Sequence, residues 1–143
     1  MAPEGQDSQR DQLVSGDVLS AQLWSTTAQQ AIDAAPQLAF VYPAEGFPFY
    51  CDCAVILRES RRARLAHQFL DYLLRPAVSA KIVQATRTAT ANGSALELLP
   101  ERVRRTPSLY PPREIFDRGE WPRTLDPATQ RLRDRIWTEI KSA

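Results

Sequence analysis

Tyr50 and Asp52 are the residues of this chain whose types and spacing could do chemistry. They stand two positions apart on an apolar stretch that follows a turn built from Pro43, Gly46 and Pro48. Residues two apart in an extended strand project from the same face, so the phenol ring and the carboxylate would lie side by side. A ring face beside a carboxylate suits an organic ammonium ion, through cation–π attraction and a charge-assisted hydrogen bond. The pattern therefore predicts an ammonium-binding site.

Cys51 and Cys53 alternate with that pair and would project from the opposite face of the strand. Their alpha carbons would lie roughly 6.6 Å apart, near the upper limit for a disulfide. We therefore expect two free thiols packed on the core side. A zinc site would need two further ligands, and His67 is the only histidine in the chain. We expect no metal and no cofactor.

Length and composition are those of an ordinary globular protein. With 143 residues, 43% hydrophobic and 24% charged, the chain is long enough for one domain with a core. The formal charge of +1 gives no electrostatic case for binding nucleic acid or a membrane surface. No apolar run approaches the roughly 20 residues of a membrane span. Residues 1–12 lack the pattern of a signal peptide, and we expect a disordered tail or an artificial extension there.

The order of the predicted elements indicates an α/β fold. Apolar stretches at residues 17–24, 38–42 and 49–57 predict buried strands, the second of them covered on both faces. The predicted helical segments are residues 26–35, a helix capped by Ser60, a helix opened by Pro76, short helices at 100–105 and after 110–112, and a terminal helix opened by Asp126 and Pro127. Residues 86–95 are predicted to form a loop.

Five short segments carry a family resemblance when they are taken in order. They read FVYPAEG at 40–46, FLDYLLRPAV at 69–78, ATAN at 89–92, LYPP at 109–112 and RIWTEIKS at 135–142. Together they resemble the C-terminal part of bacterial periplasmic polyamine-binding proteins, the putrescine and spermidine receptors of ABC importers. The LLRP junction in the second segment is fairly specific by itself, and the resemblance extends over residues 13–143.

The resemblance implies the two-lobed, type II periplasmic-binding-protein fold, in which crossing strands join two α/β lobes and the ligand lies between them. It assigns residues 13–48 to the second lobe, residues 49–92 to the hinge and a segment of the first lobe, and residues 93–143 to a C-terminal segment of the second lobe. The chain corresponds to less than half of such a protein. We therefore expect a truncated product or the remnant of a longer gene.

The resemblance also assigns ligand-binding roles. Trp24 matches a tryptophan that flattens against the methylene chain of the ligand, and Tyr50 falls where the family has another stacking aromatic. Asp52 matches the carboxylate that holds one ammonium group. Thr27 stands where the putrescine-binding branch has an acidic residue, and Thr88 stands where the family has a tyrosine. The alternative is that Trp24 and Tyr50 are ordinary core aromatics.

The function that follows from the resemblance is solute binding in the periplasm. The ligand would be a polyamine, putrescine or spermidine, and the protein partner would be the permease of an ABC importer. Because Thr27 lacks a charge, this chain presents one anion where a diamine needs two. We expect weak or incomplete binding by the chain alone.

A second hypothesis is an interaction module without ligand-binding activity. An apolar strand such as residues 38–42 would leave a large uncovered patch on a part of a larger fold. Two copies could cover it by exchanging segments across a hinge near Tyr50 or Ala91. We therefore expect a homo-oligomer.

Two further classes of function are disfavoured by the residues. The arginines at 58, 61, 62 and 64 are interspersed with Glu59 and Asp71 in a nearly neutral chain, which favours a solvated helix face over a nucleic-acid patch at Arg58, Arg61, Arg62 and Arg64. An enzyme built on Cys51 or Cys53 would need a base and an electropositive site. The adjacent charge is Asp52, which disfavours a thiolate, and His67 is predicted to be solvated. We expect no enzymatic activity.

Overall fold

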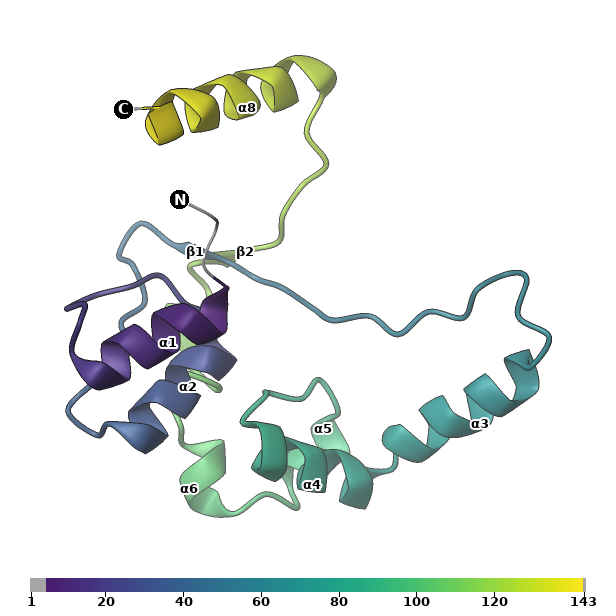
Figure 1. The fold of residues 1–143 in the computed structure, drawn as a ribbon. Coiled ribbons are helices and arrows are strands. Elements are labelled where there is room, and N and C mark those ends of the chain that lie inside the picture. Colours follow the sequence, from purple (N-terminus) through teal and green to yellow (C-terminus); the bar gives the residue numbers. More distant parts are fainter. Residues whose placement is uncertain (1–4, 143) are drawn as a thin grey trace.

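Helices account for most of the regular structure of this protein (Figure 1). The computed structural model describes residues 5–142. The helices are α1 (Gln6–Ser15), α2 (Ser25–Ala34), α3 (Ala63–Leu73), α4 (Pro76–Thr86), α5 (Gly93–Leu96), α6 (Glu101–Arg104), α7 (Arg113–Phe116) and α8 (Pro127–Ser142). Pro76 and Pro127 each occupy the first helical position, as predicted, because the amide that proline lacks would have no helical partner there.

The strands are short, so the described residues show the expected α/β character only in part. β1 (Phe47–Pro48) pairs in parallel with β2 (Gly119–Glu120), with Phe47 opposite Gly119. The predicted strands at residues 17–24, 38–42 and 49–57 do not form, so the structure is mixed helical with one small ladder. A strand needs a neighbour to pair its amides and carbonyls, and the described residues offer these apolar stretches no such neighbour.

The segment expected to be a disordered tail or an artificial extension is helical in its described part, because Gln6–Ser15 form α1. The helix ends at Gly16, whose φ of 84° is the left-handed conformation that glycine adopts at low cost. α1 lies beside α2, and the Gln6 side chain accepts a hydrogen bond from the Trp24 amide at 2.8 Å. Residues 1–4 of the predicted tail lie outside the described residues.

The best-packed part of the core lies between α4, α5 and α6. It consists of Ala80, Val83, Ala95, Leu99 and Val103, each buried. Most of these side chains are small, which lets the short helices approach closely. The predicted loop at 86–95 is confirmed for residues 87–92, and it ends at Asn92, whose side chain accepts from the Ala95 amide and caps α5.

Polar contacts join α2 to this core. Arg87 forms an ion pair with Asp33 at 2.6 Å, and its φ of 60° places it at the left-handed end of α4. Gln29 accepts from the Ser108 hydroxyl at 2.6 Å, and Gln30 donates to the Thr86 carbonyl at 3.1 Å. Since the partners come from distant parts of the chain, these contacts fix the C-terminal half of α2 relative to the end of α4 and to Ser108.

Two segments extend away from this body. The α3 arm, residues 50–74, runs outward as extended chain and returns as α3, whose end meets α4 (Figure 1). α3 begins at Ala63 rather than directly after Ser60, whose hydroxyl accepts from the Arg62 amide. α8 lies apart from the other helices beyond a linker. None of the helices within residues 5–142 is both long and apolar enough to cross a membrane.

The N-cap of α8 should make this helix sensitive to pH. Hydrogen bonds from the Thr129 hydroxyl and from the amides of Thr129 and Ala128 lower the pKa of Asp126 below its ordinary value of 3.8. A lowered pKa stabilises the folded helix above that value, and the stabilisation is lost as the pH falls through the pKa of the folded form. We expect the circular dichroism signal at 222 nm to weaken as the pH falls below about 4.

The matched variant is Asp126→Asn, because asparagine is also a good N-cap but does not titrate. It should retain the helix and lose this part of the pH dependence. An unchanged titration in Asp126→Asn would contradict the assignment.

Candidate ligand-binding site

Trp24 and Tyr50 form the aromatic pair around which the candidate site is built. Their ring centroids lie 4.5 Å apart with an interplanar angle of 57°. The side chains come from the start of α2 and from the segment after β1. Trp24 is 48% exposed and Tyr50 is 40% exposed, so the two are not core aromatics. Both rings keep part of their surface open to a ligand.

Trp24 is held by the start of α2. Its carbonyl accepts from the Ala28 amide at 2.9 Å, which places Trp24 at the N-cap position with φ −61° and ψ 145°. Its own amide donates to the Gln6 side chain. The backbone of Trp24 is therefore fixed on both sides. Gln6 was not anticipated from the sequence, because nothing local to it signals a contact 18 residues away.

Tyr50 is positioned by the short ladder. The preceding amide, that of Phe49, donates to the Glu120 carbonyl at 2.7 Å. The Phe49 ring packs on Phe116 at 4.7 Å and on Trp121 at 5.3 Å between centroids. Tyr50 therefore directly follows an anchored residue, Phe49, at the point where the α3 arm leaves the body.

Gly46 permits the turn that leads into this ladder. Its φ is 113°, and a Cβ atom at this position would lie 2.8 Å from the Arg118 carbonyl oxygen. Both features make any residue with a Cβ atom energetically costly at this position. The Pro-Ala-Glu-Gly turn is thus required for the approach of β1 to β2.

Tyr42 ties the segment before β1 to the core. Its hydroxyl donates to the carbonyl oxygens of Ser108 at 2.8 Å and Pro107 at 3.3 Å, and its ring packs on Phe47. Burial raises the pKa of Tyr42, and the neighbouring Tyr50 hydroxyl adds to the rise. The Tyr42 hydroxyl is therefore a neutral hydrogen-bond donor near Tyr50 at physiological pH.

The Thr26 hydroxyl lies beside the aromatic pair. Its Oγ1 lies 3.4 Å from the Tyr50 hydroxyl. The neighbouring Thr27, the residue chosen from the sequence, is half-buried in the first turn of α2. Consecutive helical residues point about 100° apart, so only one of the two can face the pair. Three consecutive hydroxyl residues at 25–27 were the sequence feature that could have indicated a hydroxyl contact from Thr26.

Asp52 lies two residues beyond Tyr50 in the extended part of the α3 arm. The residue is exposed, and within the described residues no hydrogen bond or ion pair reaches its carboxylate. An exposed carboxylate of this kind keeps all its acceptor capacity. The expected ring-and-carboxylate face of a strand is not formed, since residues 50–56 have no strand partner in the described chain.

The two cysteines are free, as expected, but their predicted burial is wrong. Both are exposed, and each thiol lies near a backbone carbonyl of the same segment. Their side chains would be covered only if the segment were a strand within a packed sheet. The described chain supplies no such sheet.

Thr88 lies outside the aromatic pair. It follows the left-handed end of α4, is half-buried, and donates its amide to the Thr86 hydroxyl at 3.3 Å. No hydrogen bond or ring contact within residues 5–142 connects it to Trp24 or Tyr50. The structure therefore brings two of the five sequence-derived residues into contact and adds Thr26 and Gln6 to them.

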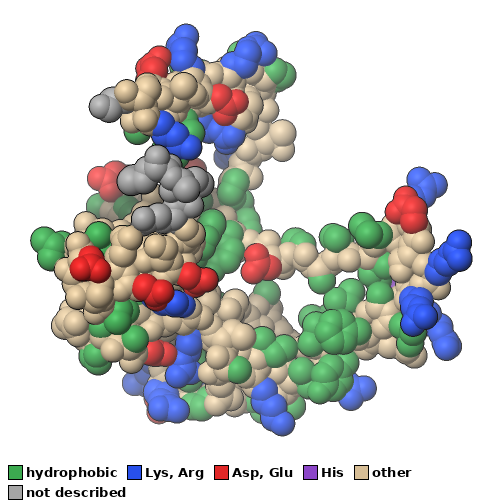
Figure 2. Space-filling model, in the orientation of Figure 1, with side chains coloured by type: hydrophobic (Ala, Val, Ile, Leu, Met, Phe, Trp, Pro, Cys, Tyr) green, Lys and Arg blue, Asp and Glu red, His purple; other side chains and the backbone are tan. Residues whose placement is uncertain are grey.

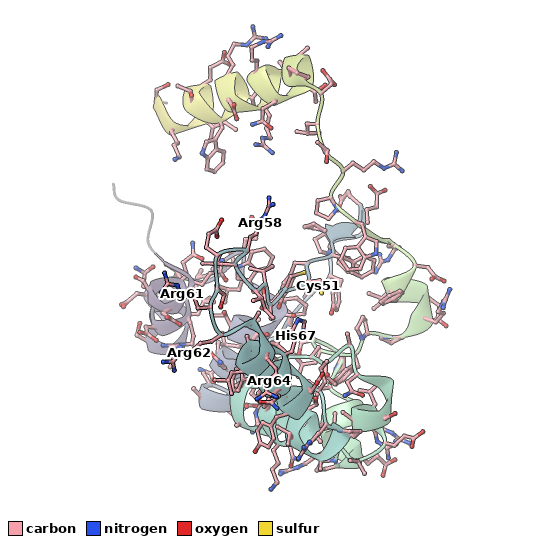
Figure 3. The ribbon with its side chains drawn as sticks, turned by 90° about the vertical axis from the view of Figure 1, so that its right-hand side faces the viewer. Cys51, Arg58, Arg61, Arg62, Arg64 and His67 are labelled. Carbon is pink, nitrogen blue, oxygen red and sulfur yellow. The ribbon has the colours of Figure 1, made fainter. Side chains whose placement is uncertain are left out.

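The arginine-rich segment is solvated. Arg58, Arg61, Arg62 and Arg64 are all exposed, and Figure 3 shows them pointing in different directions from the outer part of the α3 arm. His67, also labelled there, is exposed on α3 as predicted. These cations form no continuous row of the kind that follows a phosphate backbone.

Comparison with known proteins identifies a family for most of the chain. Residues 2–109 match the model of a family described as bacterial extracellular solute-binding protein. This match includes both members of the aromatic pair and the α3 arm.

Individual relatives agree with the family match. The chain is 33% identical over 136 residues to the putrescine-binding periplasmic protein PotF of Escherichia coli (strain K12), covering 91% of this chain and 37% of the relative. It is 26% identical over 137 residues to the spermidine/putrescine-binding periplasmic protein 1 of Haemophilus influenzae, covering 96% and 38%. It is 27% identical over 128 residues to the putrescine-binding periplasmic protein SpuD of Pseudomonas aeruginosa, covering 90% and 34%. The chain thus spans only about a third of the length of these relatives.

Proposed function

Because the chain belongs to the bacterial extracellular solute-binding proteins, we propose that it supplies an aromatic wall and one carboxylate to a polyamine site of the putrescine type. The wall is the pair Trp24 and Tyr50, and the carboxylate is that of Asp52. The observation that carries the proposal is the contact of the two rings at 4.5 Å, 26 positions apart in the sequence. These are the two aromatics that the family resemblance selects for stacking.

The chemistry of the pair suits an alkylammonium ligand. A tilted pair of half-exposed rings offers apolar surface to a methylene chain and electron-rich faces to an ammonium group. The Thr26 and Tyr50 hydroxyls add acceptors beside the rings. A cation–π contact contributes about 0.5–2 kcal/mol, depending on how far it is desolvated.

The charge of the site limits its strength. A diamine carries two cations, and a buried cation without an anion is strongly unfavourable. Asp52 can neutralise one of them, while Thr27 and Thr88 carry no charge. We therefore expect the chain alone to bind a diamine weakly, with one end held and the other end in water.

The proposal extends to the architecture and partners of the family. Residues 13–48 and 93–143 would belong to one lobe of the two-lobed fold, and residues 49–92 would form the hinge and a segment of the other. The site would then lie at the hinge, where the α3 arm leaves the body. In this context the protein would act in the periplasm and deliver its ligand to the permease of an ABC importer.

Calorimetric titration with putrescine at low salt tests the proposal. We expect heat of binding for putrescine and a similar heat for 1-aminobutane, which has the same chain length and one charge, because only one end of the ligand is held. 1-Butanol, which has the same chain length and no charge, should give none. Asp52→Asn should remove the putrescine heat, because it deletes the anion and keeps the shape. Glu97→Gln changes an exposed carboxylate at the C-cap of α5 and should leave the heat unchanged. Equal heats for Asp52→Asn and the unchanged chain would refute the assigned role of Asp52. A folded chain without heat at millimolar putrescine would refute ligand binding by this chain.

A second candidate function is favoured by a separate observation. Apolar side chains of the α3 arm are largely exposed, with Val55 at 79%, Leu57 at 72% and Phe69 at 59%. An interaction module without ligand-binding activity would use such a surface. Titration and mass measurement separate the two functions, because only the first requires an ammonium ligand.

A further inference from the structure

The helix α2 has two opposite faces, one of small buried residues and one of polar residues. Ala28 and Ala31 are buried on the first face. Successive helical residues are rotated by about 100°, so the opposite face carries Thr26, Gln29, Gln30 and Asp33. Methyl groups pack with little directional preference, whereas a hydrogen bond weakens steeply when it is misaligned. The polar face therefore determines how α2 is rotated about its axis.

Gln29 lies in the middle of the polar face, and both ends of its side-chain amide are bonded. Its Oε1 accepts from the buried Ser108 hydroxyl at 2.6 Å, and its Nε2 donates to Oδ1 of Asp33 at 2.9 Å. Oδ2 of Asp33 accepts from Nε of Arg87 at 2.6 Å. These four residues form what we call the Gln29 bridge, which attaches α2 to the end of α4 and to Ser108.

Gln30 supports the same rotation from the next position of α2. Its Nε2 donates to the Thr86 carbonyl at 3.1 Å, and its Oε1 accepts from Arg10 of α1 at 3.5 Å. Arg10 also pairs with Asp7 and Asp11, and Figure 2 shows oppositely charged side chains close together over α1. The polar face of α2 is thus bonded to both α1 and α4.

The rotation of α2 matters at the candidate site, because Thr26 lies on the same face as Gln29. Thr26 Oγ1 lies 3.4 Å from the Tyr50 hydroxyl. A rotation of α2 by the 100° that separates neighbouring residues would take this hydroxyl away from Tyr50. Trp24, at the N-cap of the same helix, would move as well and lose its ring contact with Tyr50.

The Tyr50 side of the site is attached to the same bridge. The Ser108 carbonyl accepts from the Tyr42 hydroxyl at 2.8 Å, and the Tyr42 ring packs on Phe47 of β1 at 4.6 Å between centroids. β1 leads within two residues to Tyr50. Ser108 therefore holds both sides of the aromatic pair, α2 through its hydroxyl and the segment before β1 through its carbonyl.

We propose that Gln29 is a positioning residue of the candidate site. The bond from Gln29 to Ser108 sets the rotation of α2. That rotation selects Thr26 and Trp24 as the residues that meet Tyr50. The effect of Gln29 on a ligand rests on the proposed function, whereas its effect on the aromatic pair does not.

Gln29→Glu, with and without Asp33→Asn, tests the inference. The single substitution places a second carboxylate against Asp33 and should break the bridge by repulsion. Adding Asp33→Asn should restore the bridge, because the amide at position 33 can donate to the new carboxylate and still accept from Arg87. The matched control is Gln130→Glu on α8. Gln130 donates to Asp134 at 2.8 Å with the same four-residue spacing, and it makes no hydrogen bond to another helix within the described residues.

The first readout needs no ligand. With Trp121→Phe and Trp137→Phe in the background, Trp24 is the one tryptophan left in the chain. Acrylamide quenching then reports how far its ring is covered. Gln29→Glu should raise the quenching constant toward that of Tyr50→Ala, whereas Gln130→Glu and the double variant should leave it unchanged. Helical circular dichroism shows which variants are folded.

The second readout is the calorimetric titration with putrescine. Gln29→Glu should weaken the affinity by about 2–30-fold, the equivalent of one cation–π contact, and the double variant should regain it. A folded Gln29→Glu chain with unchanged quenching of Trp24 would overturn the inference. If Gln29→Glu does not fold, the double variant decides, and an uncovered Trp24 in its folded chain would overturn the inference as well. Absence of heat from the unchanged chain would count against the proposed function alone, because the quenching result still decides the role of Gln29.

Discussion

Leu99→Ala should destabilise the chain by about 2–5 kcal/mol, the usual range for deleting most of a buried leucine side chain. Leu99 is 3% exposed and packs with Ala80, Val83, Ala95 and Val103. Its neighbours are mostly small and lie on short helices tied by loops, so they cannot collapse into the space left by the leucine. We expect the Tm to fall by roughly 10 °C in a chain of this length, measured by circular dichroism at 222 nm.

The adjacent residue supplies the control. Leu98 is 54% exposed, and Leu98→Ala should change the free energy of unfolding by less than about 0.5 kcal/mol. Equal effects of the two substitutions would show that the α4–α6 cluster is not the core of the chain. The comparison also bears on the candidate site. The cluster anchors the loop whose Ser108 carbonyl accepts from the Tyr42 hydroxyl, and it anchors α4, whose end contacts α2.

Trp24→Ala should weaken putrescine affinity by about 2–30-fold, the equivalent of the 0.5–2 kcal/mol of one cation–π contact. Tyr50 would lose its ring partner at the same time. Trp24→Phe should restore most of the affinity, because it retains a ring face of the same orientation. The measurement is the same calorimetric titration, extended to the concentrations that a weak complex requires.

Trp137 is the control for this variant. It is a half-exposed tryptophan on α8, 57% exposed against 48% for Trp24, and Lys141 already lies 5.0 Å from its ring centroid. Trp137→Ala should leave the affinity unchanged. Equal losses in Trp24→Ala and Trp137→Ala would point to diffuse adsorption on aromatic surface instead of a site at the aromatic pair.

Local signals in the sequence determined the helices. Pro76, Pro127 and Asp126 start their helices where predicted, because a missing amide or a capping carboxylate acts within one turn. The segments quoted for the family resemblance were equally local, and the family match confirms that resemblance. α1 was missed because its polar residues give no amphipathic pattern and its contacts with α2 are what hold it.

Only the tertiary structure decided what the apolar stretches became. Residues 17–24, 38–42 and 49–57 have the composition of strands, yet a strand exists only where a neighbour pairs its backbone. The described chain offers that neighbour to Phe47 and Pro48, and beyond them only to the Phe49 amide, which donates to the Glu120 carbonyl. Cys51 and Cys53 are exposed for the same reason.

The candidate site likewise depends partly on residue types and partly on tertiary contacts. The sequence and the resemblance selected Trp24 and Tyr50, but their contact depends on the start of α2 and on the β1–β2 ladder. Both of those depend on segments far apart in the chain: Gln6 holds Trp24, and Glu120 holds the residue before Tyr50. Residue types determined which chemistry was available to the site. Long-range pairing decided which of these groups meet, because signals in the sequence act within about one helical turn, whereas these contacts join segments that are far apart in the chain.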